Sequence, residues 1–253
     1  MGMKDELSAL GLKPMAWTEV LRAVQERLEP PDRDRFVRLH KNFVGYISQD
    51  TLNRFYGFVF SRGLQLEING FRFNRLESIL DVLVPMIKPG LSILDVGAGA
   101  GLVATILLKL ARPKSYVTQD PCREVRDHLM SMGFAVLPHP APNPPPNGRF
   151  DLILCIDSLG ELNADEDGAL ANPDKVAPED LPRLIEERYG FAQKLEGWKP
   201  YLAAGGKLMI WEPIAHRLAW SAIEKLAEGE GWSTRFWGEA PRHSYLELTL
   251  DKS

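Results

Sequence analysis

Three glycines at alternate positions form the stretch of this chain that is best suited to binding a ligand. Gly97, Gly99 and Gly101 follow a short apolar run at residues 91–96, which has the length and branched side chains of a buried strand. A helical pattern over residues 102–110 comes directly after them. Glycine lets the backbone approach a ligand closely, and the free N–H groups at a helix N-terminus attract its anionic parts. The sequence therefore predicts a ligand cradle between a strand and a helix.

The spacing of the glycines and a nearby acidic residue distinguish this stretch from the dinucleotide-binding pattern. That pattern has its third glycine one place later, where Leu102 stands here. Asp95 lies two residues before the first glycine, where a carboxylate would repel a pyrophosphate but can hold an ammonium group. The pattern Asp-x-Gly-x-Gly-x-Gly resembles motif I of class I S-adenosylmethionine (SAM) dependent methyltransferases, which wraps the methionine end of SAM. The resemblance implies SAM as the cofactor and the following residues as its ligands: Asp95, Gly97, Gly99 and Gly101.

A second acidic residue has the spacing of a ribose ligand. Asp120 ends a short strand pattern at residues 116–119 and follows Gly97 by 23 residues. A strand-end carboxylate near this distance accepts hydrogen bonds from ribose hydroxyls in related folds, although an aspartate before a proline is otherwise an ordinary turn residue. Motif II of the resembled family is an acid in this place. The resemblance implies that Asp120 and Pro121 contact the cofactor.

A further strand leads to the expected catalytic rim. The run at residues 150–159 resembles motif IV of the family, and ligands of open parallel sheets bind beyond the carboxyl ends of the strands. This arrangement predicts Asp157 at the rim beside the methyl group, with Ser158 and Glu161 nearby. Asp157 is therefore a candidate for both cofactor binding and catalysis.

His216 is the preferred candidate for a general base, because it follows the predicted fifth strand by a few residues on the rim side. His139, after the third strand, is the second choice, and Glu212 or Asp157 can serve instead or orient an amine. A base is required only when the attacking group must lose a proton. For each histidine, a surface or packing role is the competing interpretation.

Two loops are predicted from composition. Residues 138–148 are rich in proline, which predicts a stiff, extended connector. No acid follows the third strand, where family members often bind the adenine amino group. Adenine is therefore expected to be held by backbone groups and apolar packing. Residues 163–178 lack helical periodicity and predict a loop or lid.

Residues 1–88 predict a separate, mainly helical section. Apolar stripes indicate helices at 16–28, 36–47, 52–59 and 74–87, the third capped by Ser48 or Asp50 and the last opened by a capping box of Asn74 and Glu77. Asn69-Gly70 between alternating residues predicts a hairpin. The aromatic residues fit either a core or a dimer face.

In many members of the resembled family such a section lies over the SAM pocket and shapes the substrate site. Arg72 and Arg75 could then meet the SAM carboxylate, with a solvated surface position as the alternative.

Residues 89–253 are expected to form the SAM-binding domain. Its predicted class is α/β, a Rossmann-like doubly wound sheet of seven strands with an antiparallel final strand. One long helix is predicted at residues 179–202, a fifth strand after Gly205-Gly206, and a final strand pair within residues 233–250.

The composition fits an ordinary globular protein of 253 residues, with 45% hydrophobic and 25% charged residues. A formal net charge of −4 disfavours a nucleic-acid partner. The two cysteines, Cys122 and Cys155, have no metal-site spacing and fit a reducing compartment as small buried residues. We find no signal peptide or membrane-spanning run, so we expect a cytoplasmic protein. We also expect no bound metal.

The main functional prediction is SAM-dependent methyl transfer to a small-molecule acceptor by in-line displacement, driven mainly by positioning. One alternative keeps the enzyme but gives it a protein or RNA substrate. Another is a protein that binds SAM or S-adenosylhomocysteine without catalysis. An NAD-dependent oxidoreductase is disfavoured by Leu102 and Asp95.

Overall fold

The structure is a computed structural model that describes residues 2–45, 48–138, 148–158, 176–212, 214, 216–238 and 244–250. The predicted proline-rich connector, His139, Glu161 and nearly all of the predicted lid lie outside the described residues. Within those described ranges, no helix combines the length and the hydropathy needed to cross a bilayer.

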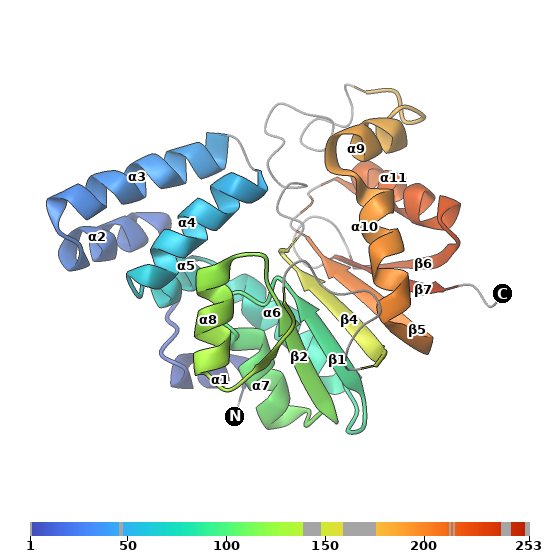
Figure 1. Cartoon of the computed structure of the whole chain (residues 1–253), viewed down its shortest axis with the longest axis horizontal. Coiled ribbons are helices and arrows are strands. Elements are labelled where there is room, and N and C mark those ends of the chain that lie inside the picture. Colours follow the sequence, from blue (N-terminus) through green and yellow to red (C-terminus); the bar gives the residue numbers. More distant parts are fainter. Residues whose placement is uncertain are drawn as a thin grey trace. The chain divides into compact units, whose positions relative to one another are not determined.

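Seven strands form one mixed sheet in the order β3-β2-β1-β4-β5-β7-β6 (Figure 1). Strand β4 pairs in parallel with β1 and β5, whereas β7 lies antiparallel between β5 and β6. The predicted Rossmann-like sheet with an antiparallel final strand is confirmed. The strands are β1 Ser92–Val96, β2 Ser115–Gln119, β3 Ala135–Val136, β4 Phe150–Ile156, β5 Leu202–Trp211, β6 Trp232–Trp237 and β7 Tyr245–Leu250.

The chain divides into two compact units, each described here by itself. The first unit contains residues 1–90 and 98–137, and the second contains residues 91–97 and 138–253. The first unit therefore joins the N-terminal helices to the helices that follow the glycine turn. The predicted domain boundary between residues 88 and 89 rests on the sequence and stays a prediction.

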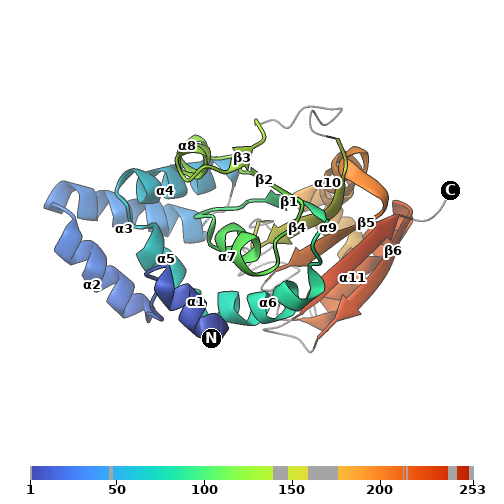
Figure 2. The same ribbon diagram turned by 90° about the horizontal axis from the view of Figure 1, so that it is seen from below.

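The first unit is mainly helical. Its helices are α1 Met3–Ala9, α2 Trp17–Arg27, α3 Pro30–Gly45, α4 Gln49–Ser61, α5 Gln65–Phe71, α6 Phe73–Met86, α7 Leu102–Leu110 and α8 Arg123–Ser131. Helices α1 and α6 pack beside α7 (Figure 2). A separate core holds α2 to α5 together, with these buried residues: Val20, Val24, Leu28, Phe36, Phe55, Phe58, Val59, Leu64 and Ile68.

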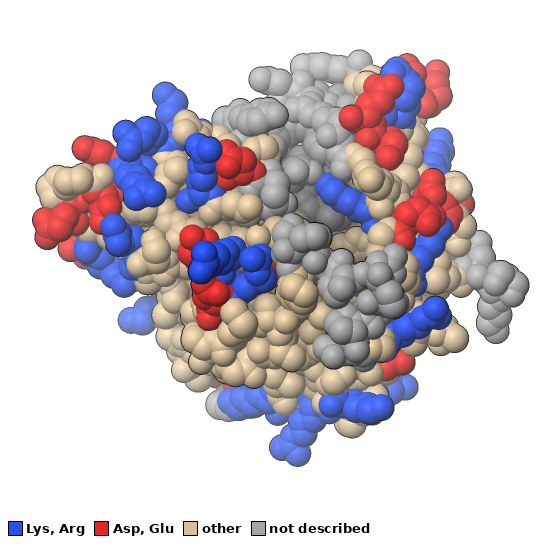
Figure 3. Space-filling view, viewed as in Figure 1, with Lys and Arg blue, Asp and Glu red and all other residues tan. Residues whose placement is uncertain are grey.

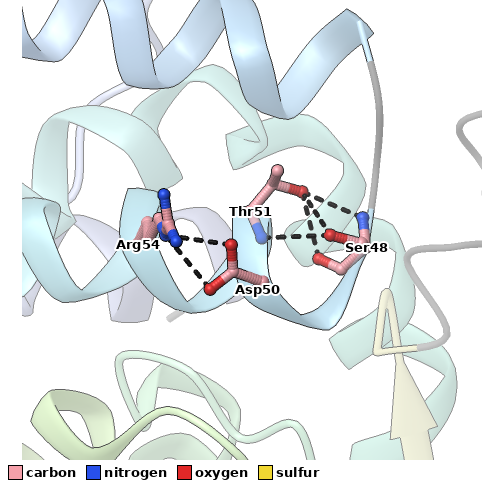
Figure 4. A network of polar contacts seen from close by, with 4 residues as sticks. All are labelled: Ser48, Asp50, Thr51 and Arg54. Atoms are coloured by element: carbon pink, nitrogen blue, oxygen red, sulfur yellow. Dashed lines mark hydrogen bonds and ion pairs between the residues drawn. The ribbon is translucent and has the colours of Figure 1, made fainter.

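The predicted cap of α4 at Ser48 is confirmed (Figure 4). The Ser48 hydroxyl accepts a hydrogen bond from the backbone N–H of Thr51 at 3.2 Å, and the backbone N–H of Ser48 donates to the Thr51 hydroxyl at 2.9 Å. Arg54 pairs with Asp50 one turn apart at 3.0 Å. These bonds satisfy N–H groups that a helix start otherwise leaves without a partner.

The predicted hairpin at Asn69-Gly70 is wrong, because this segment forms helix α5. Leu64 and Ile68, four residues apart, are buried, whereas Leu66 between them is 37% exposed, which is helical rather than strand periodicity. A Cβ on Gly70 would lie 2.6 Å from the Lys13 carbonyl oxygen. Gly70 therefore allows a close backbone approach and does not mark a turn.

The predicted capping box of Asn74 and Glu77 is also wrong. Helix α6 begins one residue earlier, at Phe73, with Arg72 at its N-cap. Phe73 is 1% exposed, so its burial explains why the helix includes it.

The described residues of the second unit form β1, β4 to β7 and the helices α9 Leu181–Tyr189, α10 Phe191–Trp198 and α11 Arg217–Gly229. The single helix predicted over residues 179–202 is wrong. Gly190 adopts a left-handed conformation with φ of 56° and separates α9 from α10. A 3₁₀ turn at Lys199–Tyr201 follows, and residue 202 already belongs to β5.

A lysine on α7 neutralises a buried carboxylate on α1, which predicts a measurable loss of stability. The Lys109 ammonium contacts the Glu6 carboxylate, and the side chains are 54% and 5% exposed, respectively. Lys109→Met should lower the free energy of unfolding by about 1–2 kcal/mol, between the values for exposed and buried pairs. Urea denaturation measures this loss. The exposed Lys114→Met is the control, and equal effects of both variants would contradict the pairing.

Candidate cofactor site

The turn after β1 has a backbone conformation that requires glycine. Gly97, Gly99 and Gly101 have φ values of 70°, 53° and 69°. Residues with a side chain rarely adopt this left-handed region. The alternate glycines therefore have a local structural reason, and their role as cofactor ligands stays a prediction.

In the first unit, Gly101 also has a packing reason. It is the N-cap of α7, and a Cβ there would lie 2.9 Å from Phe134 Cε2 and 3.1 Å from Leu129 Cδ2. The Thr105 hydroxyl donates to the Gly101 carbonyl oxygen at 2.8 Å and secures the first turn. The start of α7 is thus fixed against the region that ends α8.

The Asp120 carboxylate is held against the glycine turn. One carboxylate oxygen accepts a hydrogen bond from the Gly99 backbone N–H at 3.3 Å, and the other accepts one from the Cys122 backbone N–H at 2.9 Å. Arg126 donates to the carbonyl oxygens of Asp120 and Pro121 at 2.8 Å and 2.7 Å. The turn after β2 is therefore ordered around this carboxylate, and each oxygen retains a further lone pair.

Burial sets the proton affinity of Asp120. The residue is 7% exposed, and its burial raises the pKa of the carboxyl to about 6. The N–H groups of Cys122 and Gly99, together with the Arg126 charge, lower this pKa and offset part of the desolvation. Sequence spacing predicted where Asp120 lies. It missed Arg126, although a basic residue six positions after Asp120 was an available signal.

In the second unit, the turn after β1 meets the end of β4. A Cβ on Gly97 would lie 2.4 Å from the Cβ of Ser158. Asp157, the preceding residue, has φ of 49° and donates its backbone N–H to the Trp211 carbonyl oxygen at 2.8 Å. A non-glycine residue in this conformation is strained by about 1–3 kcal/mol, and such strain is common at functional sites.

Buried acidic groups surround Cys155 at the carboxyl ends of these strands. Asp95 and Glu212 are 2% and 1% exposed. Burial raises the pKa of the Cys155 thiol well above its usual range, and the charges of Glu212 and Asp95 raise it further. Cys155 therefore stays protonated and is unsuited to act as a nucleophile. Throughout the described ranges, no group of three or more acidic, histidine or cysteine residues is arranged to hold a metal ion.

The predicted base His216 lies at the N-cap of α11, and its carbonyl oxygen accepts the Trp220 backbone N–H at 3.4 Å. Arg72 and Arg75 lie at the start of α6 in the first unit. The structure places these residues on their elements, and the chemical roles given to them stay predictions.

Comparisons with known proteins find a methyltransferase-domain match over part of the chain. Residues 68–172 match the model of a family described as a methyltransferase domain. No curated protein sequence matches the chain. Among solved structures, human N-acetylserotonin methyltransferase in complex with SAM is 14% identical, with a TM-score of 0.48 over 93% of this chain and 66% of that chain. The ribosomal protein L11 methylase of Lactobacillus delbrueckii subsp. bulgaricus is 20% identical, with a TM-score of 0.44 over 72% and 80%.

The family match includes the glycine turn, and the sheet order, with its antiparallel β7, is the one expected from the resemblance of that turn to motif I. This match agrees with the SAM-dependent methyltransferase that motif I predicted.

Proposed function

We propose that the enzyme transfers the methyl group of SAM to a small-molecule acceptor. The proposal rests on the ordered carboxylate of Asp120 at the end of β2. This carboxylate accepts a hydrogen bond from the Gly99 backbone N–H of the glycine turn. A buried carboxylate with free lone pairs suits the two hydroxyls of a ribose. The glycine turn would let the rest of the SAM molecule approach its backbone closely, because no side chain projects from the turn at Gly99 or Gly101.

The proposal of a small acceptor rests on the first unit. Helix α4 packs on α8, so the N-terminal helices crowd the side on which Asp120 lies. Acidic and basic side chains are interspersed over α2, α3 and α4 on the face drawn in Figure 3. Binding of RNA instead favours a continuous basic surface. These features support a small acceptor over a nucleic acid.

The proposed mechanism relies on positioning. SAM supplies an electrophilic methyl group on a sulfonium, which is already a good leaving group. Asp120 and the glycine turn would fix the nucleoside, and such alignment can lower a barrier by about 7–11 kcal/mol. The cofactor-binding roles that the resemblance implies for Asp95, Gly97 and Asp157 stay predictions. His216 or Asp157 accepts a proton where the acceptor must lose one.

The proposed location is the cytoplasm, because Cys122 and Cys155 are buried free thiols, which fits a reducing compartment. Association into a homodimer stays a prediction that light scattering can test.

Calorimetric titration with SAM, S-adenosylhomocysteine and NAD tests the proposal first. We expect micromolar binding of the two sulfur compounds and none of NAD. Incubation with methyl-labelled SAM and separate pools of metabolites, proteins and RNA should then label the metabolite pool. Label in the protein or RNA pool would overturn the small-molecule assignment. Binding of SAM without transfer to any pool would favour a non-catalytic SAM-binding protein.

The affinity for SAM should fall about 10-fold between pH 7.5 and pH 5.0. Binding through two hydroxyls favours ionised Asp120, and at one pH unit below its pKa only about a tenth of this carboxyl is ionised. The folded-state pKa of about 6 lies above 3.8, the ordinary pKa of an aspartate carboxyl. Proton binding by this group therefore favours folding below pH 3.8, and that contribution is lost as the pH rises through about 6. The affinity for SAM instead rises as the pH increases through this pKa. Asp120→Asn should remove the slope, and an equal slope in that variant would contradict this explanation.

A further inference from the structure

Helix α4 packs beside α8 in the first unit, as both ribbon views show (Figures 1 and 2). The Cys122 thiol donates to the Asn53 carbonyl oxygen at 3.7 Å. A Cβ on Gly57 would lie 3.1 Å from the Glu124 carboxylate oxygen Oε2, so the two helices approach closely at this point. A segment outside the family match thus contacts the first residues of α8.

The contacts advance in the same direction along both helices. One turn beyond Gly57, the Phe60 ring lies 5.1 Å from the His128 ring. The series of contacts begins at Asn53 and Cys122. Cys122 follows the end of β2, and its backbone N–H donates to the Asp120 carboxylate.

Tyr56 lies between Asn53 and Gly57 of α4, the two positions that contact the first residues of α8. Its half-buried side chain packs against the cluster of Cys122, Val125 and Leu129, which Ala98 of the glycine turn also contacts. On its other side, the ring of Phe55 lies 5.4 Å away in an edge-to-face arrangement. The tyrosine ring is therefore fixed between the helical core and residues that adjoin the ribose acid.

We propose that Tyr56 forms a wall of the adenosine site and packs against the nucleoside of SAM. This inference rests on the proposed function of Asp120. An aromatic ring offers stacking to a base without needing an acidic partner, and the sequence provides no acid directly after β3. Cys122, a member of the cluster on which Tyr56 packs, donates its backbone N–H to the Asp120 carboxylate. The N-terminal section then takes part in binding the cofactor.

Binding of SAM and of 5′-methylthioadenosine, which lacks the amino-acid part, tests the inference by calorimetry. Tyr56→Ala should weaken both about 10-fold and by the same factor, whereas Tyr56→Phe should keep both within 3-fold because it retains the ring. Phe60→Ala is the matched control, because Phe60 is a half-buried aromatic residue of the same helix and cluster. It should lower the melting temperature similarly and leave both affinities within 3-fold.

The outcomes separate this inference from the proposed function. Absence of SAM binding by the wild-type chain would overturn the function itself. Binding by the wild type, with equal affinities in Tyr56→Ala and Phe60→Ala, would overturn the role of Tyr56 alone. A loss for SAM without a loss for 5′-methylthioadenosine would also overturn it, because the ring would then act on the amino-acid part.

Discussion

Asp120→Ala is expected to lower the affinity for SAM at least 100-fold. The proposed site gives this carboxylate both ribose hydroxyls, and a hydrogen bond to a charged group contributes about 1.5–3 kcal/mol. Loss of two such bonds exceeds the roughly 2.7 kcal/mol that corresponds to a factor of 100. The variant also removes the acceptor of the Gly99 and Cys122 N–H groups, which loosens the turn. Calorimetry at pH 8, above the pKa of about 6, measures the effect on the ionised form.

Asp127→Ala is the matched control for this experiment. Asp127 lies on α8 with a side chain that is 58% exposed, and it pairs only weakly with Arg123 at 3.6 Å. Its affinity for SAM should equal that of the wild type. If Asp120→Ala stays within 3-fold of this control, Asp120 is not the ribose ligand, and motif II must be assigned elsewhere.

The elements around the glycine turn could be predicted because their signals are local. The buried strand β1 and the helix α7 coincide with the apolar runs that predicted them. Branched residues in a short run and glycines at a strand end report the conformation of the residues that carry them. The position of Asp120 at the end of β2 followed from the same kind of signal.

The errors arose where a distant contact decides the local structure. Gly70 in helix α5 meets the carbonyl oxygen of Lys13, and a turn dipeptide gives no sign of such a contact. The break at Gly190 was missed for a different reason. Apolar periodicity continues on both sides of this glycine, although α9 ends there and α10 begins directly after it. A single glycine within a helical pattern is often tolerated, so periodicity alone favoured one long helix.

The packing around the candidate site was also outside the reach of the sequence. The contact between Cys122 and Asn53 joins residues that are 69 positions apart. Each residue has an ordinary local explanation, as a small buried side chain and as a helical position. Only the fold shows that α4 adjoins the turn of Asp120, and this is why Tyr56 emerges from the structure alone.

Gly97→Ala is expected to lower the free energy of unfolding by about 3–5 kcal/mol, the sum of backbone strain and overpacking. The φ of 70° disfavours any side chain, and the new Cβ would lie 2.4 Å from Ser158 Cβ. Gly231→Ala isolates the strain, because Gly231 has a φ of 77° and no atom within 4 Å of its Cβ position. That control should lose only about 1–2 kcal/mol. Both are measured by urea denaturation.

A second change separates the contact from the strain. Ser158→Gly removes the nearest atom, so the double variant Gly97→Ala/Ser158→Gly should recover most of the difference between Gly97→Ala and the Gly231→Ala control. The recovery is a coupling energy, expected only for residues in direct contact. If the two substitutions are additive, the turn after β1 does not press on the end of β4. The close approach that fixes Gly97 beside Ser158 would then be wrong.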